Sequence, residues 1–313
     1  MIKKIYGKHT FYFSIFAITL SVTALLFGNK IEAPNELMIS FICLFLILSI
    51  GISHGAMDNY KANKLLEIYK KKSKSIFYIL YMSISAIIIL LWSLYPLVTL
   101  LIFLIIASYH FGREDTTFLH QGNYYVDQAL YLIKGSLIVF APLFFHIDET
   151  IEIFETLLIS DNILIYIKKE HWIINVCLGF SIFGYLYFVN KNKYEDFEVL
   201  FLDMLSILII NYVFNPLIAF TIYFCFLHSI RHIISISHEL NGDNFYLGLK
   251  AFVKKALPLT IITAVLYLLA AVFLSNFYGL NDVIIKVIFI GLASLTFPHI
   301  LLEYLLEINE TKN

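Results

Sequence analysis

Five of the ten histidines fall near the ends of apolar runs of the sequence: His54, His110, His228, His232 and His299. His228 and His232 are four residues apart, which places both imidazoles on one face of a helix, the geometry with which two imidazoles hold one metal ion. Imidazole-only sites without a thiolate suit iron, copper or zinc, and oxygen chemistry would favour iron. The five histidines therefore predict one polar, metal-binding cluster.

Acidic residues follow two of these histidines closely. Asp58 lies four residues after His54, and Glu114 and Asp115 come directly after the segment that holds His110. A carboxylate near a metal-ligating histidine accepts the second N–H of the imidazole and fixes its orientation. The alternative interpretation is that these acids are solvated loop residues beside lysines.

Two further residues are candidates for supporting roles. Asp203 lies within an apolar run, so we expect it to be an internal hydrogen-bonding partner, for example of a ligand histidine. Tyr223 belongs to the aromatic stretch 220–226 that precedes His228, and this stretch could line a pocket for a long, flat polyene. Ordinary packing between helices would explain the same aromatic residues.

The elements that must position these residues are membrane-spanning helices. Of the 313 residues, 60% are hydrophobic and 14% charged, against roughly 45–50% and 25% for a soluble domain. The sequence predicts an all-α, polytopic helical bundle of eight to ten spans that forms a single domain over residues 1–313. The expected spans are 10–28, 37–57, 76–95, 97–112, 129–147, 171–190, 199–213, 216–234, 256–274 and 283–302.

The distribution of basic residues predicts the orientation. Ten spans with a cytoplasmic N-terminus place most of the 22 lysines and arginines in the cytoplasm. We therefore expect a multi-pass protein of the inner (plasma) membrane with both termini cytoplasmic and an interfacial helix over 148–170 on the outer side. The same arrangement puts the five histidines at one depth, although no histidine was used to derive it.

Two functional classes are disfavoured by composition. A formal net charge of −1 offers no basic surface for a nucleic acid. The three cysteines, Cys43, Cys177 and Cys225, are far apart and have no CxxC spacing, so we expect small core residues and no zinc or redox pair.

Four segments around the histidines resemble the Brp/Blh-type β-carotene 15,15′-dioxygenases, a family of integral membrane enzymes found with microbial rhodopsins. The segments are Ser53–Asp58 (SHGAMD), Tyr109–Asp115 (YHFGRED), Phe224–His232 (FCFLHSIRH) and Phe297–Leu301 (FPHIL). They occur in the order of the family and at similar separations, and the resemblance extends over about residues 40–305. Ser53 stands where the family frequently has proline, and Asp203 where it often has glutamate.

The resemblance implies a non-haem Fe(II) held by His54, His110, His228 and His232, with His299 in a supporting or substrate-contacting role. The implied reaction is the cleavage of the central double bond of β-carotene by O₂ into two molecules of all-trans-retinal. The substrate would enter from the membrane lipid, and the retinal would supply a microbial rhodopsin.

Other functions stay open on the sequence alone. A non-enzymatic carotenoid or retinal carrier, or an opsin assembly factor, would not need histidines from several spans to converge. A different histidine-box membrane oxygenase, such as a di-iron desaturase, normally has more histidine boxes than the single His228–His232 pair.

Overall fold

The protein is a bundle of helices. The computed structural model describes residues 2–28, 35–53, 55–70, 74–116, 124–191 and 194–310, and these residues form no β-strand. Within the described ranges, eight helices are long and apolar enough to cross a membrane. The predicted all-α, polytopic class is confirmed.

Eight of the ten predicted spans correspond to these candidate membrane-crossing helices, whereas the predicted spans 171–190 and 199–213 lie on helices that are not among the eight. Pro96 and Pro216 each occupy the first position of a helix, where the missing N–H would have no partner and the fixed φ suits helical geometry. The helices are α1 (Ile2–Phe27), α2 (Glu36–Leu46), α4 (Lys74–Leu94), α5 (Pro96–Glu114), α6 (Tyr124–Gly135), α7 (Leu137–Phe145), α10 (His171–Lys191), α11 (Tyr194–Val213), α12 (Pro216–Ile222), α13 (Ile230–Leu240), α14 (Phe245–Leu274) and α15 (Leu280–Glu310).

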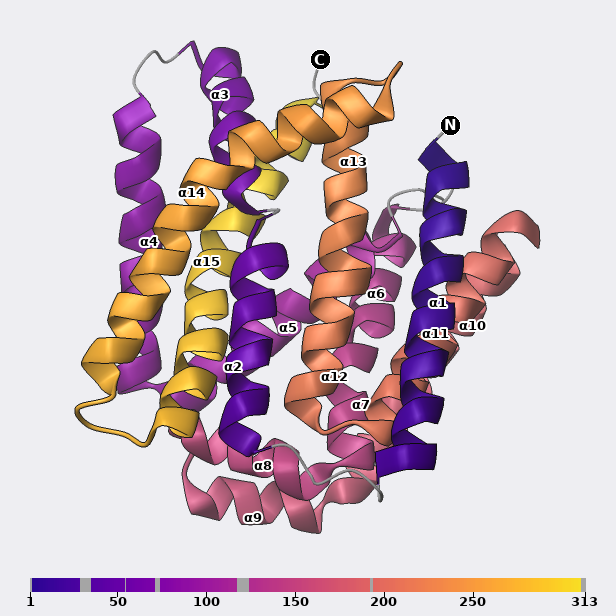
Figure 1. Ribbon diagram of the computed structural model, residues 1–313, viewed down its shortest axis with the longest axis vertical. Coiled ribbons are helices and arrows are strands. Elements are labelled where there is room, and N and C mark those ends of the chain that lie inside the picture. Colours follow the sequence, from indigo (N-terminus) through magenta and orange to yellow (C-terminus); the bar gives the residue numbers. More distant parts are fainter. Residues whose placement is uncertain are drawn as a thin grey trace.

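Three short helices lie at the two ends of the bundle (Figure 1). Helix α3 (Asp58–Ile68) lies at the same end as both chain termini, whereas α8 (Ile147–Thr156) and α9 (Asp161–Lys169) lie across the opposite end. The segment 148–170, expected as one interfacial helix, therefore forms two helices, and Leu158 between them adopts a positive φ of 74°. Which side of the membrane each end faces stays a prediction.

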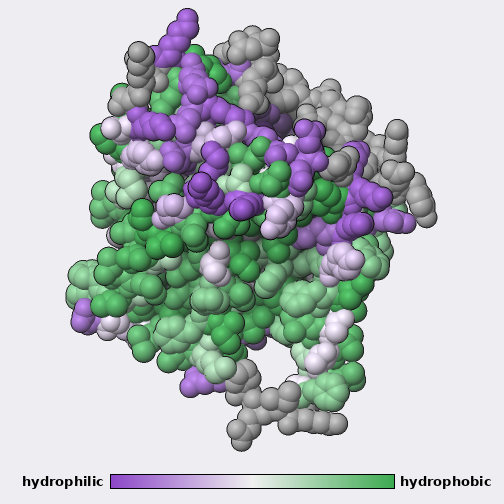
Figure 2. Space-filling view, turned by 45° about the horizontal axis from the view of Figure 1, so that its top comes forward, coloured by the Kyte–Doolittle hydropathy of each residue, from purple (hydrophilic) through white to green (hydrophobic). Residues whose placement is uncertain are grey.

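The surface matches a membrane environment. Figure 2 shows hydrophilic residues gathered at the end that carries α3 and the termini, with hydrophobic residues over most of the remaining visible surface. Large apolar side chains on the lipid-facing helices are exposed, for example Ile79 and Val272. Burial of these side chains in lipid removes the penalty that water would impose on them.

Two helices that carry histidine motifs contain π-helical turns that face each other. These turns are Ile47–Gly51, which continues α2, and Tyr223–Ser229, which joins α12 to α13. A Cβ added at Gly51 would lie 2.6 Å from Cε1 of Phe224, so only glycine permits this approach, and Ser229 Oγ donates to the carbonyl of Gly51 at 3.1 Å. Such π-helical turns occur frequently at functional sites.

Helix α5, which carries His110, is held closely against α6. A Cβ at Gly112 would lie 1.8 Å from the carbonyl oxygen of Tyr131, and one at Gly135 would lie 1.7 Å from that of Ser108. Small residues allow two helix backbones to approach in a membrane, where packing drives their association. This contact fixes the depth and rotation of the segment around His110.

Candidate metal centre

Four of the five predicted histidines converge inside the bundle. The ring centroids of His110 and His228 are 5.2 Å apart, those of His110 and His299 are also 5.2 Å apart, and those of His232 and His299 are 6.0 Å apart. The fifth, His54, lies outside the described residues. Three separate stretches of chain, α5, the π-helical turn with α13, and α15, thus bring their imidazoles to one place.

The four described histidines of the cluster are almost fully buried in the protein. His110, His228, His232 and His299 are between 1% and 6% exposed. Helix α13 continues to Leu240 and α15 to Glu310, so His232 and His299 lie two turns or more inside their helices. Polar residues thus extend both helices beyond the predicted span ends at 234 and 302.

Three carboxylates hold three of the imidazoles. Asp115 Oδ1 lies 3.1 Å from Nδ1 of His228, Glu114 Oε2 lies 3.0 Å from Nδ1 of His232, and Asp58 Oδ1 lies 2.8 Å from Nδ1 of His299. The carboxylates named by the sequence are therefore hydrogen-bonded to the histidines and are not solvated loop residues. Each binds a histidine on another helix and not the histidine that precedes it in the chain.

This pattern assigns the protons of the three rings. A carboxylate accepts a hydrogen bond from the Nδ1–H group, which leaves the lone pair of a neutral imidazole on Nε2. Metal-ligating histidines commonly donate their other ring N–H to a carboxylate in this way. The donor set therefore fits a metal ion bound by Nε2 atoms.

Asp115 is the most connected of the three carboxylates. Besides His228, its side chain accepts the hydroxyl proton of Tyr223 at 2.7 Å, and its backbone carbonyl accepts from Arg231 at 3.0 Å. Burial would raise the pKa of the Asp115 carboxyl, but the hydrogen bond with His228 and the charges of Lys134 and Arg231 lower this pKa below its ordinary value. Asp115 is therefore an ionised acceptor. Tyr223 contacts the metal centre through it.

Within the described part of the chain, the hydrogen bonds of Asp203 go to an arginine and a threonine and not to a histidine. Its two carboxylate oxygens accept from the Arg231 guanidinium at 2.8 and 2.9 Å, and Thr10 Oγ1 lies 3.3 Å from Oδ1. The suggestion that Asp203 orients a ligand histidine is therefore corrected. Asp203 instead neutralises the buried guanidinium of Arg231, which lies between His228 and His232 in the sequence. A buried charge requires such a partner.

One side of the cluster is a wall of aromatic rings. Phe220 stacks on Phe224 with centroids 5.3 Å apart, and Phe224 stacks on the imidazole of His228 at 5.8 Å. Phe111 contacts the same imidazole edge-on at 4.7 Å, and Phe289 lies against Phe220 at 5.4 Å. The aromatic stretch predicted to line a polyene pocket thus borders the histidines directly.

Sequence reasoning missed three polar residues beside the cluster. Lys61 pairs with Glu303 and places its Nζ 3.4 Å from Nε2 of His232, and Tyr81 donates to Asp58 Oδ2 at 2.9 Å. The position of Glu303, four residues after His299, was the available signal, because this spacing puts both side chains on one helix face. Lys61 stands among several loop lysines, and nothing in its local sequence marks it.

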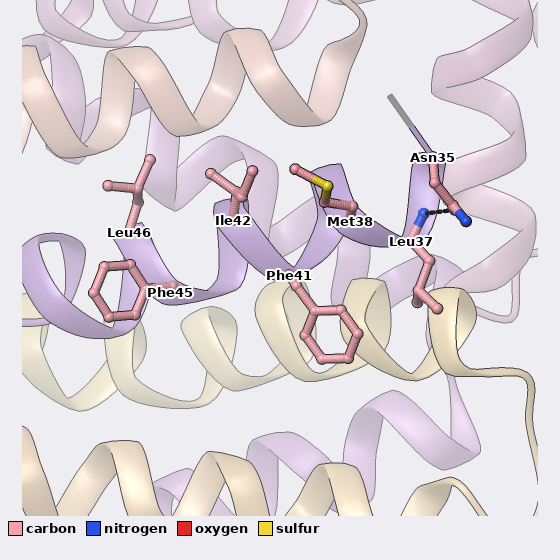
Figure 3. Close-up of a pocket in the computed structure, with 7 residues that line it drawn as sticks. All are labelled: Asn35, Leu37, Met38, Phe41, Ile42, Phe45 and Leu46. Atoms are coloured by element: carbon pink, nitrogen blue, oxygen red, sulfur yellow. Dashed lines mark hydrogen bonds between the residues drawn. The ribbon is translucent and has the colours of Figure 1, made fainter. Parts of the chain in front are cut away.

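A shallow groove elsewhere does not belong to this site. It has a volume of about 620 Å³ and lies along α2, lined by apolar side chains such as Met38, Phe41 and Phe45 together with Asn35 (Figure 3). No histidine or carboxylate lines it. Its position on the apolar outer face of one helix is that of a lipid-facing surface.

Comparisons with known proteins match most of this chain. The family model for β-carotene 15,15′-dioxygenase matches residues 45–307. A curated relative, the β-carotene 15,15′-dioxygenase of uncultured marine bacterium 66A03, is 26% identical over 273 residues, which cover 85% of this chain and 93% of the relative. No solved structure matches the chain.

Proposed function

Since the chain belongs to the β-carotene 15,15′-dioxygenase family, we propose that it is a membrane enzyme that cleaves the central double bond of β-carotene with O₂ into two molecules of all-trans-retinal. One oxygen atom enters each aldehyde, so the reaction balances without a further reductant. The observation that carries the proposal is the buried group of four imidazoles, three of them oriented by carboxylates.

We propose Fe(II) as the metal of this centre. By the motifs of the family, its ligands would be His54, His110, His228 and His232, and His299 is suitably placed to join them. Neutral imidazoles without a thiolate suit iron. When bound, the iron would supply the redox chemistry that makes O₂ reactive toward a double bond.

The protein side chains have three tasks in this reaction. Asp58, Glu114 and Asp115 hold the imidazoles in one tautomer, so that the donor atoms are in place before the metal and substrate bind. The near-complete burial of the cluster excludes water from the reacting bond. The aromatic wall of Phe220 and Phe224 provides a flat apolar surface on which a polyene would lie.

Substrate and product are both soluble in the bilayer. We expect β-carotene to reach the histidines from the lipid of the plasma membrane and retinal to leave by the same phase, with a microbial rhodopsin as its recipient. A central cut requires that the polyene is held with its middle at the metal centre and about half its length on each side.

Expression in a β-carotene-accumulating bacterium tests the proposal. We expect the orange colour to bleach and chromatography to show retinal, whereas a His228→Ala variant produced at the same level in the membrane should leave the colour unchanged. A non-enzymatic carrier would bind carotenoid or retinal without bleaching. Unchanged colour with the parent protein present, folded and iron-loaded would refute the proposed activity.

A further inference from the structure

Glu303 presents a carboxylate to the same space as two of the histidines. It lies one helical turn after His299 on α15, and the ligand atoms of His232, His299 and Glu303 all lie within 4.8 Å of one another. Two imidazole nitrogens and one carboxylate oxygen at this spacing can bind a single cation. This donor set is typical of non-haem Fe(II) oxygenases.

Lys61 is the ion-pair partner of this carboxylate. Its ammonium group on α3 is hydrogen-bonded to Glu303, and the side chains of Lys61 and Glu303 are only 11% and 17% exposed. A buried ion pair that keeps both charges hydrogen-bonded holds its members in one geometry. Lys61 itself has donors only and cannot bind a metal ion.

We propose that Glu303 is an oxygen donor of the metal centre, beside His299, and that Lys61 is the counter-ion of its carboxylate. The inference rests on the proposed function, because it assumes that the histidine cluster binds a metal. It extends the donor set beyond the four histidines of the family motifs. The alternative is that Glu303 serves only as the counter-ion of Lys61.

The geometry around His232 makes the two alternatives distinguishable. The Lys61 ammonium lies 3.4 Å from Nε2 of His232, the atom that a metal would also use. Lys61 and the metal ion therefore compete for one lone pair, and both are cations. Removal of Lys61 should leave metal affinity unchanged or increase it, whereas removal of Glu303 should decrease it.

The experiment compares Glu303→Gln, Lys61→Met and the double variant with the parent protein. The double variant removes both charges, so it leaves no buried charge uncompensated and is expected to fold. Glu307→Gln is the matched control, because Glu307 lies one turn further along α15 and pairs with Arg113 at 3.0 Å. For each purified protein we would measure Co(II) affinity and the visible absorption spectrum of the Co(II) form.

We expect Glu303→Gln and the double variant to lose at least about tenfold in Co(II) affinity and to show a changed Co(II) spectrum. Loss of a residue that only supports a metal ligand already costs about 10–100-fold in affinity, so loss of a ligand should cost at least the lower value. Lys61→Met and Glu307→Gln should keep the parent spectrum and bind at least as tightly. A double variant with the affinity and spectrum of the parent would show that Glu303 is only a counter-ion. Failure of the parent protein to bind any metal would instead refute the proposed function.

Discussion

Replacement of Asp115 by asparagine tests whether the carboxylates prepare the histidines for the metal. Asp115 accepts from two buried donors, Nδ1 of His228 at 3.1 Å and the Tyr223 hydroxyl at 2.7 Å. Asparagine has the same shape but offers one acceptor oxygen and an NH₂ group, so only one of the two donors can keep its acceptor. If His228 loses its acceptor, its proton can move to Nε2 and remove the lone pair that the metal requires.

Two independent estimates give the size of this effect. Loss of a hydrogen bond to a charged group costs about 1.5–3 kcal/mol. Loss of an outer-sphere partner lowers metal affinity by about 10–100-fold, which corresponds to about 1.4–2.8 kcal/mol. We therefore expect Asp115→Asn to bind metal about 10–100-fold more weakly than the parent protein and to produce correspondingly less retinal.

The assay is a titration of the purified protein with Fe(II) or Co(II) against a competing chelator, with retinal formation measured in parallel. Asp148→Asn is the matched control, because Asp148 carries the same side chain in an exposed pair with Lys168 on α8 and α9. An Asp115→Asn protein that folds and binds metal within twofold of the parent would refute the reasoning. The carboxylate would then support the fold without orienting His228.

Four further outcomes are expected. His299→Ala should lose metal as severely as replacement of the other histidines, and metal analysis that shows full occupancy would restrict His299 to substrate contact. Gly51→Ala should slow retinal formation severalfold, because its Cβ would displace the ring of Phe224, with Gly179→Ala as the control since no atom lies within 4 Å of an added Cβ there. Asp203→Asn should lower the unfolding free energy by about 3–5 kcal/mol in detergent, because it strands a buried guanidinium, and an unchanged denaturation midpoint would contradict this. Retinal should be the only product from β-carotene, and dihydroxylated carotenoids should react more slowly because their hydroxyls would be desolvated. In product chromatography, long apocarotenals would show off-centre cleavage, and equal turnover of dihydroxylated carotenoids would show that their hydroxyls are not desolvated.

The all-α class and the positions of eight membrane-crossing helices could be predicted because long apolar runs are a property of local sequence, whereas the predicted spans 171–190 and 199–213 are not among those eight. Interruptions inside the spans could not be predicted. The break at Ser136 between α6 and α7 and the π-helical turns around Gly51 and Phe224 lie inside apolar runs, so the apolar pattern does not mark them. They depend on tertiary contacts, such as the hydrogen bond of His9 on α1 to the carbonyl of Phe226 at 2.9 Å.

The identities of the site residues were more predictable than their pairing. Histidines at membrane depth are costly unless they serve a function, so His110 and His228 could be singled out from the sequence. Asp58 and Asp115 could be singled out because each follows a histidine within five residues. Their partners depend on how the helices pack. Asp58 binds His299, which lies 241 residues away, and Asp203 binds Arg231 instead of a ligand histidine. Reasoning from the sequence favoured partners that are close along the chain, whereas the folded bundle pairs residues from different helices.

The crossed pairing has a consequence for how the site forms. Each carboxylate–histidine pair joins two elements, so that Asp58 links α3 to α15, Asp115 links the end of α5 to the π-helical turn, and Glu114 links the end of α5 to α13. No single helix can therefore orient its own imidazole. The metal-binding geometry exists only after these helices have packed, and a metal ion that binds all of them stabilises that packing in turn, since binding to the native state alone adds to its stability. A cluster built in this way couples the assembly of the bundle to the completion of the site, which explains why its carboxylates are drawn from helices other than those of the histidines they hold.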